Sequence, residues 1–153
     1  MAYKSAGMFK QTYQQQRINK DKRFLEKAAD FAHIAAARNS ADFKPWRLLA
    51  QINVLFAEQA EGQQKQKYLQ MAFDDLQQAV NRYPGSGKLH YLLANIAEQL
   101  DRNDIALCHY HTAVDIENAY RTQFRIMYPD RETVISRLGN AAYTEAKSKI
   151  EAR

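Results

Sequence analysis

The run Gly85-Ser86-Gly87-Lys88 has the glycines and the lysine of a phosphate-binding loop. Such a loop also needs an earlier glycine, a serine or threonine after the lysine, and a preceding strand. Arg82 occupies the position of the earlier glycine, Leu89 follows the lysine, and the residues before the run have a helical pattern. The run therefore predicts a turn between two helices and no nucleotide site.

Cys108, His109 and His111 form the densest group of metal-binding residue types in the chain. Ligands on one helix must be three or four residues apart to share a face. Only Cys108 and His111 satisfy that spacing, and one pair cannot complete a tetrahedral site. His33 and His90 have no comparable neighbours in the sequence. We therefore expect no metal site.

Paired carboxylates occur at Asp74-Asp75 and at Asp101 with Asp104. These positions are typical of solvated helix residues, and Asp104 fits the first turn of a helix, where the helix dipole favours a negative charge. No nucleophile stands with a base at a catalytic spacing. The sequence therefore predicts a protein that is not an enzyme, with no catalytic residues and no cofactor.

The net charge of +5 is concentrated near the two ends of the chain. Residues 1–42 carry eight Lys and Arg against four Asp and Glu, and residues 119–153 carry seven against four, whereas residues 85–118 carry two against five. A nucleic acid or an anionic membrane surface would need the N-terminal cations to form one continuous face. Asp21 and Glu26 interrupt them, so a solvated basic face is favoured. The basic residues concerned are Lys4, Lys10, Arg17, Lys20, Lys22, Arg23 and Lys27.

The elements that position these residues are expected to be helices. Five glycines and three prolines leave long uninterrupted stretches, and no run of 18 apolar residues occurs that would span a bilayer. Breaks rich in polar residues, glycine or proline divide the chain into eight expected helices. Their approximate ranges are 3–17, 21–38, 43–60, 63–82, 89–100, 104–116, 119–127 and 130–150.

An offset of 34 residues aligns the fourth expected helix with the sixth. Small residues fall on small residues, and a bulky residue lies between them in both helices. This pattern is typical of stacked helical hairpins, because small residues let two helices cross closely. The aligned pairs are Ala72 with Ala106, Leu76 with Tyr110, Ala79 with Ala113 and Val80 with Val114.

These residues resemble the tetratricopeptide repeat. Residues 87–118 match that repeat without a gap, with Leu93-Ala94 at the Leu-Gly pair of its first helix. Residues 43–84 match a longer version that starts near Trp46 and ends at Pro84, and Leu138-Gly139 repeats the first-helix pattern. The resemblance implies an all-α, right-handed superhelical stack of antiparallel helix hairpins, a TPR-like α-solenoid, with a C-terminal capping helix.

The resemblance also implies one repeat domain over residues 1–153. Its hairpins are expected at about 1–42, 43–84 and 85–118, and residues 119–153 should hold a short helix followed by the capping helix. A chain of this kind presents a surface to other proteins. We therefore expect a non-catalytic protein-interaction or scaffold module.

In that family, side chains at fixed positions of each first helix line a concave groove. Carried over to this chain, the resemblance predicts a polar and modestly basic groove. Lysine and arginine can bind a carboxylate, and asparagine can both donate to and accept from a peptide backbone. An extended acidic or C-terminal peptide is the favoured ligand. The predicted groove residues are Lys44, Arg47, Gln51, Lys88, Tyr91, Asn95, Glu98 and Asn140.

A narrower resemblance concerns residues 119–129, which are similar to the soluble C-terminal repeat regions of bacterial O-antigen ligase-like or polymerase-like membrane proteins. It implies an envelope-associated fragment of a longer protein, with any membrane contact made by the missing part. As an isolated chain, the expected compartment is the cytoplasm. A dimerising module is the alternative to a peptide-binding groove.

Overall fold

The computed structural model describes the backbone of residues 2–152, and side chains from Gln15 onward except at positions 17 and 18. Every regular element in this part of the chain is an α-helix. The helices are α1 (Ala2–Arg38), α2 (Lys44–Glu58), α3 (Gly62–Arg82), α4 (Gly87–Gln99), α5 (Asn103–Met127) and α6 (Asn140–Glu151).

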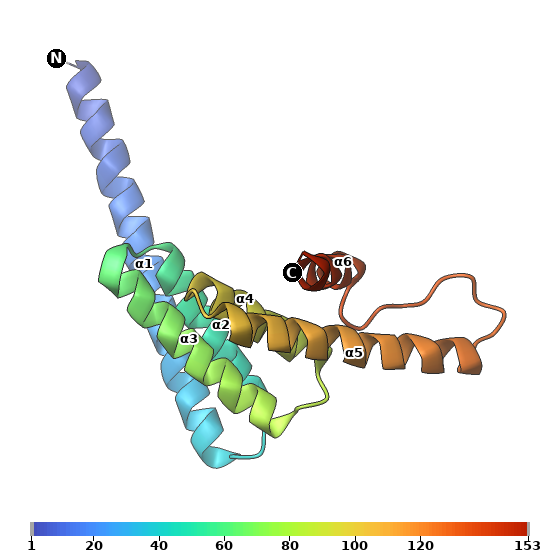
Figure 1. The fold of residues 1–153 in the computed structure, drawn as a ribbon. Helices are drawn as coiled ribbons and strands as arrows, with labels where there is room; N and C mark the ends of the chain where they lie inside the picture. Colours follow the sequence, from blue (N-terminus) through green and yellow to red (C-terminus); the bar gives the residue numbers. More distant parts are fainter. Residues whose placement is uncertain (1, 153) are drawn as a thin grey trace.

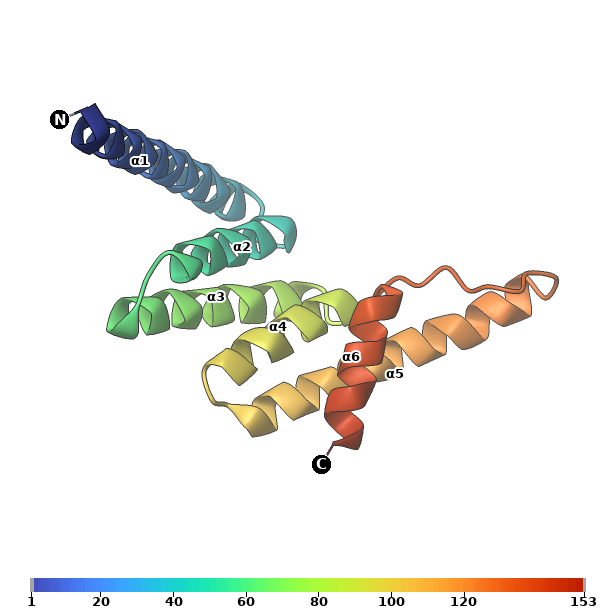
Figure 2. The same cartoon turned by 90° about the horizontal axis from the view of Figure 1, so that it is seen from above.

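Two antiparallel hairpins, α2/α3 and α4/α5, form the centre of the molecule. Seen from above, α1 to α5 lie one beside the next in chain order, and α6 crosses over the last hairpin (Figure 2). The predicted TPR-like α-solenoid is therefore confirmed, and α6 takes the place of the expected capping helix. None of the described helices is long and apolar enough to cross a membrane.

The hairpins pack through the small residues that the 34-residue offset aligned. Ala106 and Ala113 on α5 are only 3% and 0% exposed, and Ala72 and Ala79 on α3 are equally buried. Tyr110 lies buried between the two alanines of α5. Because an alanine adds little bulk, the helix axes can approach closely while the larger side chain fills the space beside the contact.

The turn between α3 and α4 shows why its glycines are present. The Ser86 hydroxyl accepts a hydrogen bond from the Leu89 backbone N–H and so caps α4. A Cβ atom at Gly87 would lie 3.2 Å from the Ala113 carbonyl oxygen of α5. The run that resembles a phosphate loop is a helix-to-helix turn, as predicted, and Gly87 permits close helix packing.

The predicted first hairpin is wrong. Residues 2–38 form one continuous 37-residue helix, whose N-terminal part projects away from the other helices (Figure 1). The expected break near residues 18–20 contains no glycine or proline, so nothing stops a helix that has already nucleated. Ala32 and Ala36 of α1 are buried where the helix packs beside α2, whereas Phe24 and Phe31 are exposed.

The predicted boundaries after residue 116 are also wrong. The sixth and seventh expected helices are one helix, α5, because Asn118 stands where the repeat usually has a proline and does not interrupt it. Residues 128–139 then form an irregular connection, and the last helix begins at Asn140 instead of near Asp130. Gly139, directly before α6, has φ of 97°, a left-handed conformation that favours glycine.

Candidate functional site

A hollow of about 460 Å³ lies on the face shared by α2, α3 and α4, and we call it the α2–α4 hollow. Its base is apolar, and three side-chain amides stand among its lining residues. No Asp or Glu belongs to that lining. The lining residues are Ala50, Gln51, Val54, Leu55, Leu76, Leu92, Asn95, Ile96 and Gln99.

The structure brings together two of the predicted groove residues, Gln51 of α2 and Asn95 of α4, at this hollow. The Tyr110 hydroxyl donates a hydrogen bond to Asn95 Oδ1 at 2.6 Å and so holds the amide in place. Burial raises the pKa of Tyr110, and the neighbouring Glu98 carboxylate raises it further. Tyr110 therefore stays protonated and remains a donor across the physiological range.

The three predicted cations of the groove lie in the first turns of α2 and α4. Lys44 and Lys88 are exposed, and the half-buried Arg47 has its guanidinium 5.8 Å from the ring centroid of Phe43. Each helix N-terminus carries a partial positive charge in addition to these side chains. At the start of α2 the Asp42 carboxylate already accepts a hydrogen bond from the Lys44 backbone N–H at 2.9 Å, so the three cationic side chains are what favour a further negative group.

Two further predicted groove residues contact α6. The Tyr91 hydroxyl donates to a carboxylate oxygen of Glu145, and Lys149 Nζ lies 2.5 Å from Glu98 Oε1. Burial, and then the bond to Glu145, raises the pKa of Tyr91. Helix α6 is therefore tied to α4 at Tyr91 and Glu98, which stay half-buried, and no residue of α6 lines the α2–α4 hollow.

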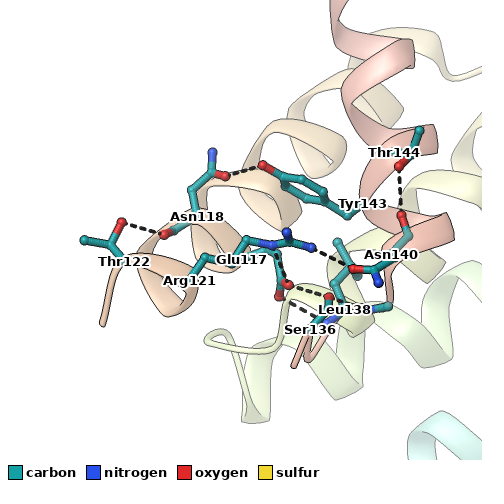
Figure 3. A network of polar contacts seen from close by, with 10 residues as sticks. Glu117, Asn118, Arg121, Thr122, Ser136, Leu138, Asn140, Tyr143 and Thr144 are labelled. Carbon is teal, nitrogen blue, oxygen red and sulfur yellow. Dashed lines mark hydrogen bonds and ion pairs between the residues drawn. The ribbon is translucent and has the colours of Figure 1, made fainter. Parts of the chain in front are cut away.

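The eighth predicted residue, Asn140, is the first residue of α6 and lies apart from the hollow. Its Oδ1 accepts a hydrogen bond from Arg121 of α5 at 3.1 Å (Figure 3). The Tyr143 hydroxyl, one turn further along α6, donates to Asn118 Oδ1 at 2.6 Å. These contacts give Asn140 a role in attaching α6 to α5.

Glu117 is the centre of this attachment, and sequence reasoning missed it. Its side chain is 2% exposed and accepts hydrogen bonds from Arg121 Nε, the Ser136 hydroxyl and the Leu138 backbone N–H (Figure 3). Three donors compensate for burying the carboxylate. The only signal in the sequence was an acidic residue at a helix position that faces the core.

The residues considered for metal binding do not come together in one site. Among the described residues, no three His, Cys, Asp or Glu side chains are placed to hold a metal ion. Cys108 and His111 are both exposed. His90, which the sequence left without a neighbour, instead contacts His109, with their Nδ1 atoms 2.9 Å apart.

The carboxylates considered for catalysis have structural partners. Asp74 accepts a hydrogen bond from Gln70, and Asp75 accepts one from Asn53 at 2.8 Å. Burial raises the pKa of Asp75 to about 6. Asp101, with φ of 57°, lies in the turn between α4 and α5, and Asp104 lies in the first turn of α5, as predicted.

Comparisons with known proteins agree with this architecture. The structure resembles the crystal structure of a thermophilic TPR protein from Thermus thermophilus, with a TM-score of 0.57 and 18% sequence identity. The match covers 89% of this chain and 69% of that protein. At this identity the likeness shows the fold alone, which is a TPR-like helical repeat.

No family model matches the sequence, and no curated protein matches it. The comparisons therefore lend no support to the resemblance between residues 119–129 and O-antigen ligase-like proteins. The predicted groove residues are placed by the structure, and their role in binding stays a prediction.

Proposed function

We propose that this chain is a non-catalytic protein-interaction module that binds an extended peptide along α2 and α4. The observation that supports this most directly is the α2–α4 hollow, which combines an apolar base with three side-chain amides. The exposed Lys44 and Lys88 lie in the first turns of two of the helices that form it. The fold is consistent with this role, because stacked hairpins leave one face of the first helices free for a partner.

The apolar base provides an anchor for one or two side chains of the peptide. Leu55, Val54 and Leu92 line the hollow, and Leu55 is 42% exposed. The volume of about 460 Å³ lies within the range of small-molecule and side-chain pockets. Burying an apolar peptide side chain against these residues supplies most of the binding free energy.

The amides fix the peptide backbone. Gln51, Asn95 and Gln99 stand on both sides of the apolar base, and each amide can donate to a carbonyl and accept from an N–H. An extended peptide exposes both groups along its length. The three amides can therefore bind the backbone of peptides that differ in sequence, while the apolar base selects among the peptide side chains.

The cations set the direction and charge of the ligand. Lys44, Arg47 and Lys88 lie at the N-terminal ends of α2 and α4, and the amides and apolar residues follow toward the C-terminal ends. A peptide with an acidic residue or its terminal carboxylate near the cations, and an apolar residue several positions away, matches this surface. Such charges chiefly increase the association rate and the specificity.

The test is a peptide array whose members vary independently in acidic and apolar content. The wild-type protein should capture peptides that carry both features, and the variant Lys44→Glu/Lys88→Glu should bind them at least about tenfold more weakly. The matched control is Lys65→Glu/Lys67→Glu, which makes the same charge change at exposed positions of α3 outside the hollow. Equal losses in both variants would indicate a nonspecific charge effect and contradict the proposal.

A further inference from the structure

A second concave site lies at the far end of α5 and is separate from the α2–α4 hollow. It has a volume of about 440 Å³ and is formed by the last turns of α5 and the irregular connection of residues 128–139. We call it the arginine–aromatic pocket. The lining residues used below are Tyr120, Phe124, Tyr128, Arg131, Ile135 and Arg137.

Three aromatic rings form one side of the pocket. Tyr120, Phe124 and Tyr128 follow one another at intervals of four residues, so they lie on one face at the end of α5. Their ring centroids are 6.1 and 4.9 Å apart in sequence order, with the rings tilted. Phe124, the middle ring of the row, is buried and so held in place by the fold.

Two guanidinium groups are stacked on the outer rings of this row. Arg137 lies 4.3 Å from the ring centroid of Tyr120, and Arg131 lies 5.1 Å from that of Tyr128. Stacking restrains both side chains but leaves the N–H groups at the guanidinium edges available for hydrogen bonds. Both arginines line the same pocket, so either guanidinium can bind an anion there.

The lining of the pocket contains no carboxylate that could pair with these arginines. None of its lining residues is Asp or Glu, and neither arginine has an ion pair with a carboxylate in the described part of the chain. Asp130 and Glu132 flank Arg131 in the sequence but do not line the pocket. The local charge is therefore positive and uncompensated on the pocket side.

The pocket also has an apolar, aliphatic part. Ile135 is 62% exposed, and Met127, which also lines the pocket, is similarly exposed. A large aliphatic side chain held at the surface beside two arginines favours a ligand with an apolar group close to its negative charge. A free phosphate ion or a purely acidic side chain would leave this apolar surface in water.

We propose that the arginine–aromatic pocket binds the C-terminal carboxylate of a partner polypeptide that ends in an apolar residue. Arg131 and Arg137 bind the carboxylate, and the terminal side chain packs on Ile135 and the ring of Tyr128. A bidentate arginine–carboxylate pair supplies geometric specificity, and the apolar contact selects the last residue. This proposal does not depend on the α2–α4 hollow, because no residue belongs to both sites.

The test uses N-acetylated pentapeptides that end in leucine, either as the free acid or as the C-terminal amide. Binding to the full chain is measured by fluorescence anisotropy with a labelled free-acid peptide. We expect the free acid to bind at least about tenfold more tightly than the amide. The variant Arg131→Gln/Arg137→Gln should lose this preference, and Ile135→Ala should bind the free acid several-fold more weakly.

The matched control is Arg125→Gln, which removes an exposed arginine of α5 that does not line the pocket and should bind as the wild type does. Thermal melting of each variant shows whether the fold is retained. Equal binding of acid and amide, or no binding of the free acid at millimolar concentrations, would overturn the proposal. Stronger competition by phenyl phosphate than by N-acetyl-leucine would also overturn it, because the pocket would then prefer a phosphate.

Discussion

His109 Nδ1 of α5 lies 2.9 Å from His90 Nδ1 of α4, which ties the two helices of the second hairpin together. The Nε2 atom of His90 lies 2.8 Å from the Pro84 carbonyl oxygen, which can only accept a hydrogen bond. With His90 neutral, its Nε2–H donates to Pro84, so its Nδ1 must accept from the Nδ1–H of His109. The pair thus links α5, α4 and the turn that precedes α4.

This pair predicts a loss of stability in mild acid. Burial, and then the charge of His90, lowers the pKa of His109 below its usual 6.5. Below pH 6.5 the unfolded chain takes up a proton at this position more readily than the folded chain, so the free energy of unfolding falls as the pH decreases. We expect the free energy of unfolding, measured by urea unfolding, to be lower at about pH 5 than at about pH 7.5.

The variant His109→Gln should show a weaker pH dependence over the same range. His111→Gln, which changes an exposed histidine of the same helix, should keep the wild-type dependence. If the two variants have the same pH dependence, the His90–His109 contact does not control stability in this range.

Asp75 predicts the opposite pH effect. Because burial raises its pKa in the folded protein to about 6, the unfolded chain ionises first as the pH rises past 3.8. The folded state is therefore penalised progressively from pH 3.8 to about 6, and fully above that. Asp75→Asn should stabilise the protein by about 1 kcal/mol at neutral pH, and this gain should vanish below about pH 3.5.

The neutral amide in Asp75→Asn can still accept the hydrogen bond from Asn53, so the substitution tests the charge and keeps the contact. The exposed neighbour provides the control, and Asp74→Asn should change stability little at either pH. If Asp75→Asn is less stable than the wild type at neutral pH, the ionised Asp75 carboxylate stabilises the folded protein, which would contradict this prediction.

Close helix packing at Ala113 can be tested by adding bulk. Ala113 is fully buried, so a larger side chain has no space there. Its carbonyl oxygen would lie 3.2 Å from a Cβ atom at Gly87, which shows how closely the two helices approach. Ala113→Leu should lower the free energy of unfolding by about 1–3 kcal/mol. Ala119→Leu, at an exposed position of the same helix, should have little effect. Chemical denaturation of both variants measures the difference, and equal stabilities would contradict the packing described.

The attachment of α6 depends on Glu117. Removing this buried carboxylate in Glu117→Ala leaves Arg121 Nε, the Ser136 hydroxyl and the Leu138 N–H without this acceptor, which costs about 3 kcal/mol. Hydrogen exchange followed by mass spectrometry should show that the variant exchanges faster than the wild type in residues 128–151, with a smaller increase in α2 and α3. Exposed Glu132→Ala is the control. Uniformly faster exchange throughout the chain would show that Glu117 supports the whole fold and has no specific role at α6.

The two central hairpins could be predicted from the sequence because their signals are local. The aligned alanines mark the close contacts, and Pro84 and Gly85 mark a turn that no helix crosses. The first hairpin could not be predicted correctly because the residues between 17 and 21 contain no strong helix breaker, and an apolar stripe is compatible with one helix or with two. The C-terminal connection is fixed by Glu117 and Leu138, a contact across 21 residues that helical periodicity does not encode.

The candidate site could be predicted only in part. Gln51 and Asn95 meet at one hollow because they occupy equivalent positions in two stacked hairpins, as the repeat pattern implies. The contacts of Tyr91 and Glu98 with α6 depend on where the chain returns after residue 139, which the repeat pattern leaves open. The arginine–aromatic pocket depends on the path of residues 128–139, where the sequence predicted the start of a helix.

The apolar part of the α2–α4 hollow can be tested with one pair of variants. Leu55 lines the hollow and is 42% exposed, whereas Ile105 on α5 is 40% exposed and lies outside it. Leu55→Asp should weaken binding of the best array peptide at least about tenfold, because a charge would replace the apolar contact. Ile105→Asp should leave the affinity unchanged, as measured by isothermal titration calorimetry.

The most direct test of the central proposal is chemical-shift mapping of the backbone amides while the best array peptide is added. We predict that the largest changes occur at Gln51, Leu55, Leu92, Asn95 and Gln99, with smaller changes near Lys44 and Lys88. Changes concentrated on the exposed faces of α3 and α5, with the α2–α4 hollow unaffected, would contradict the proposal that this face of the repeat holds the peptide.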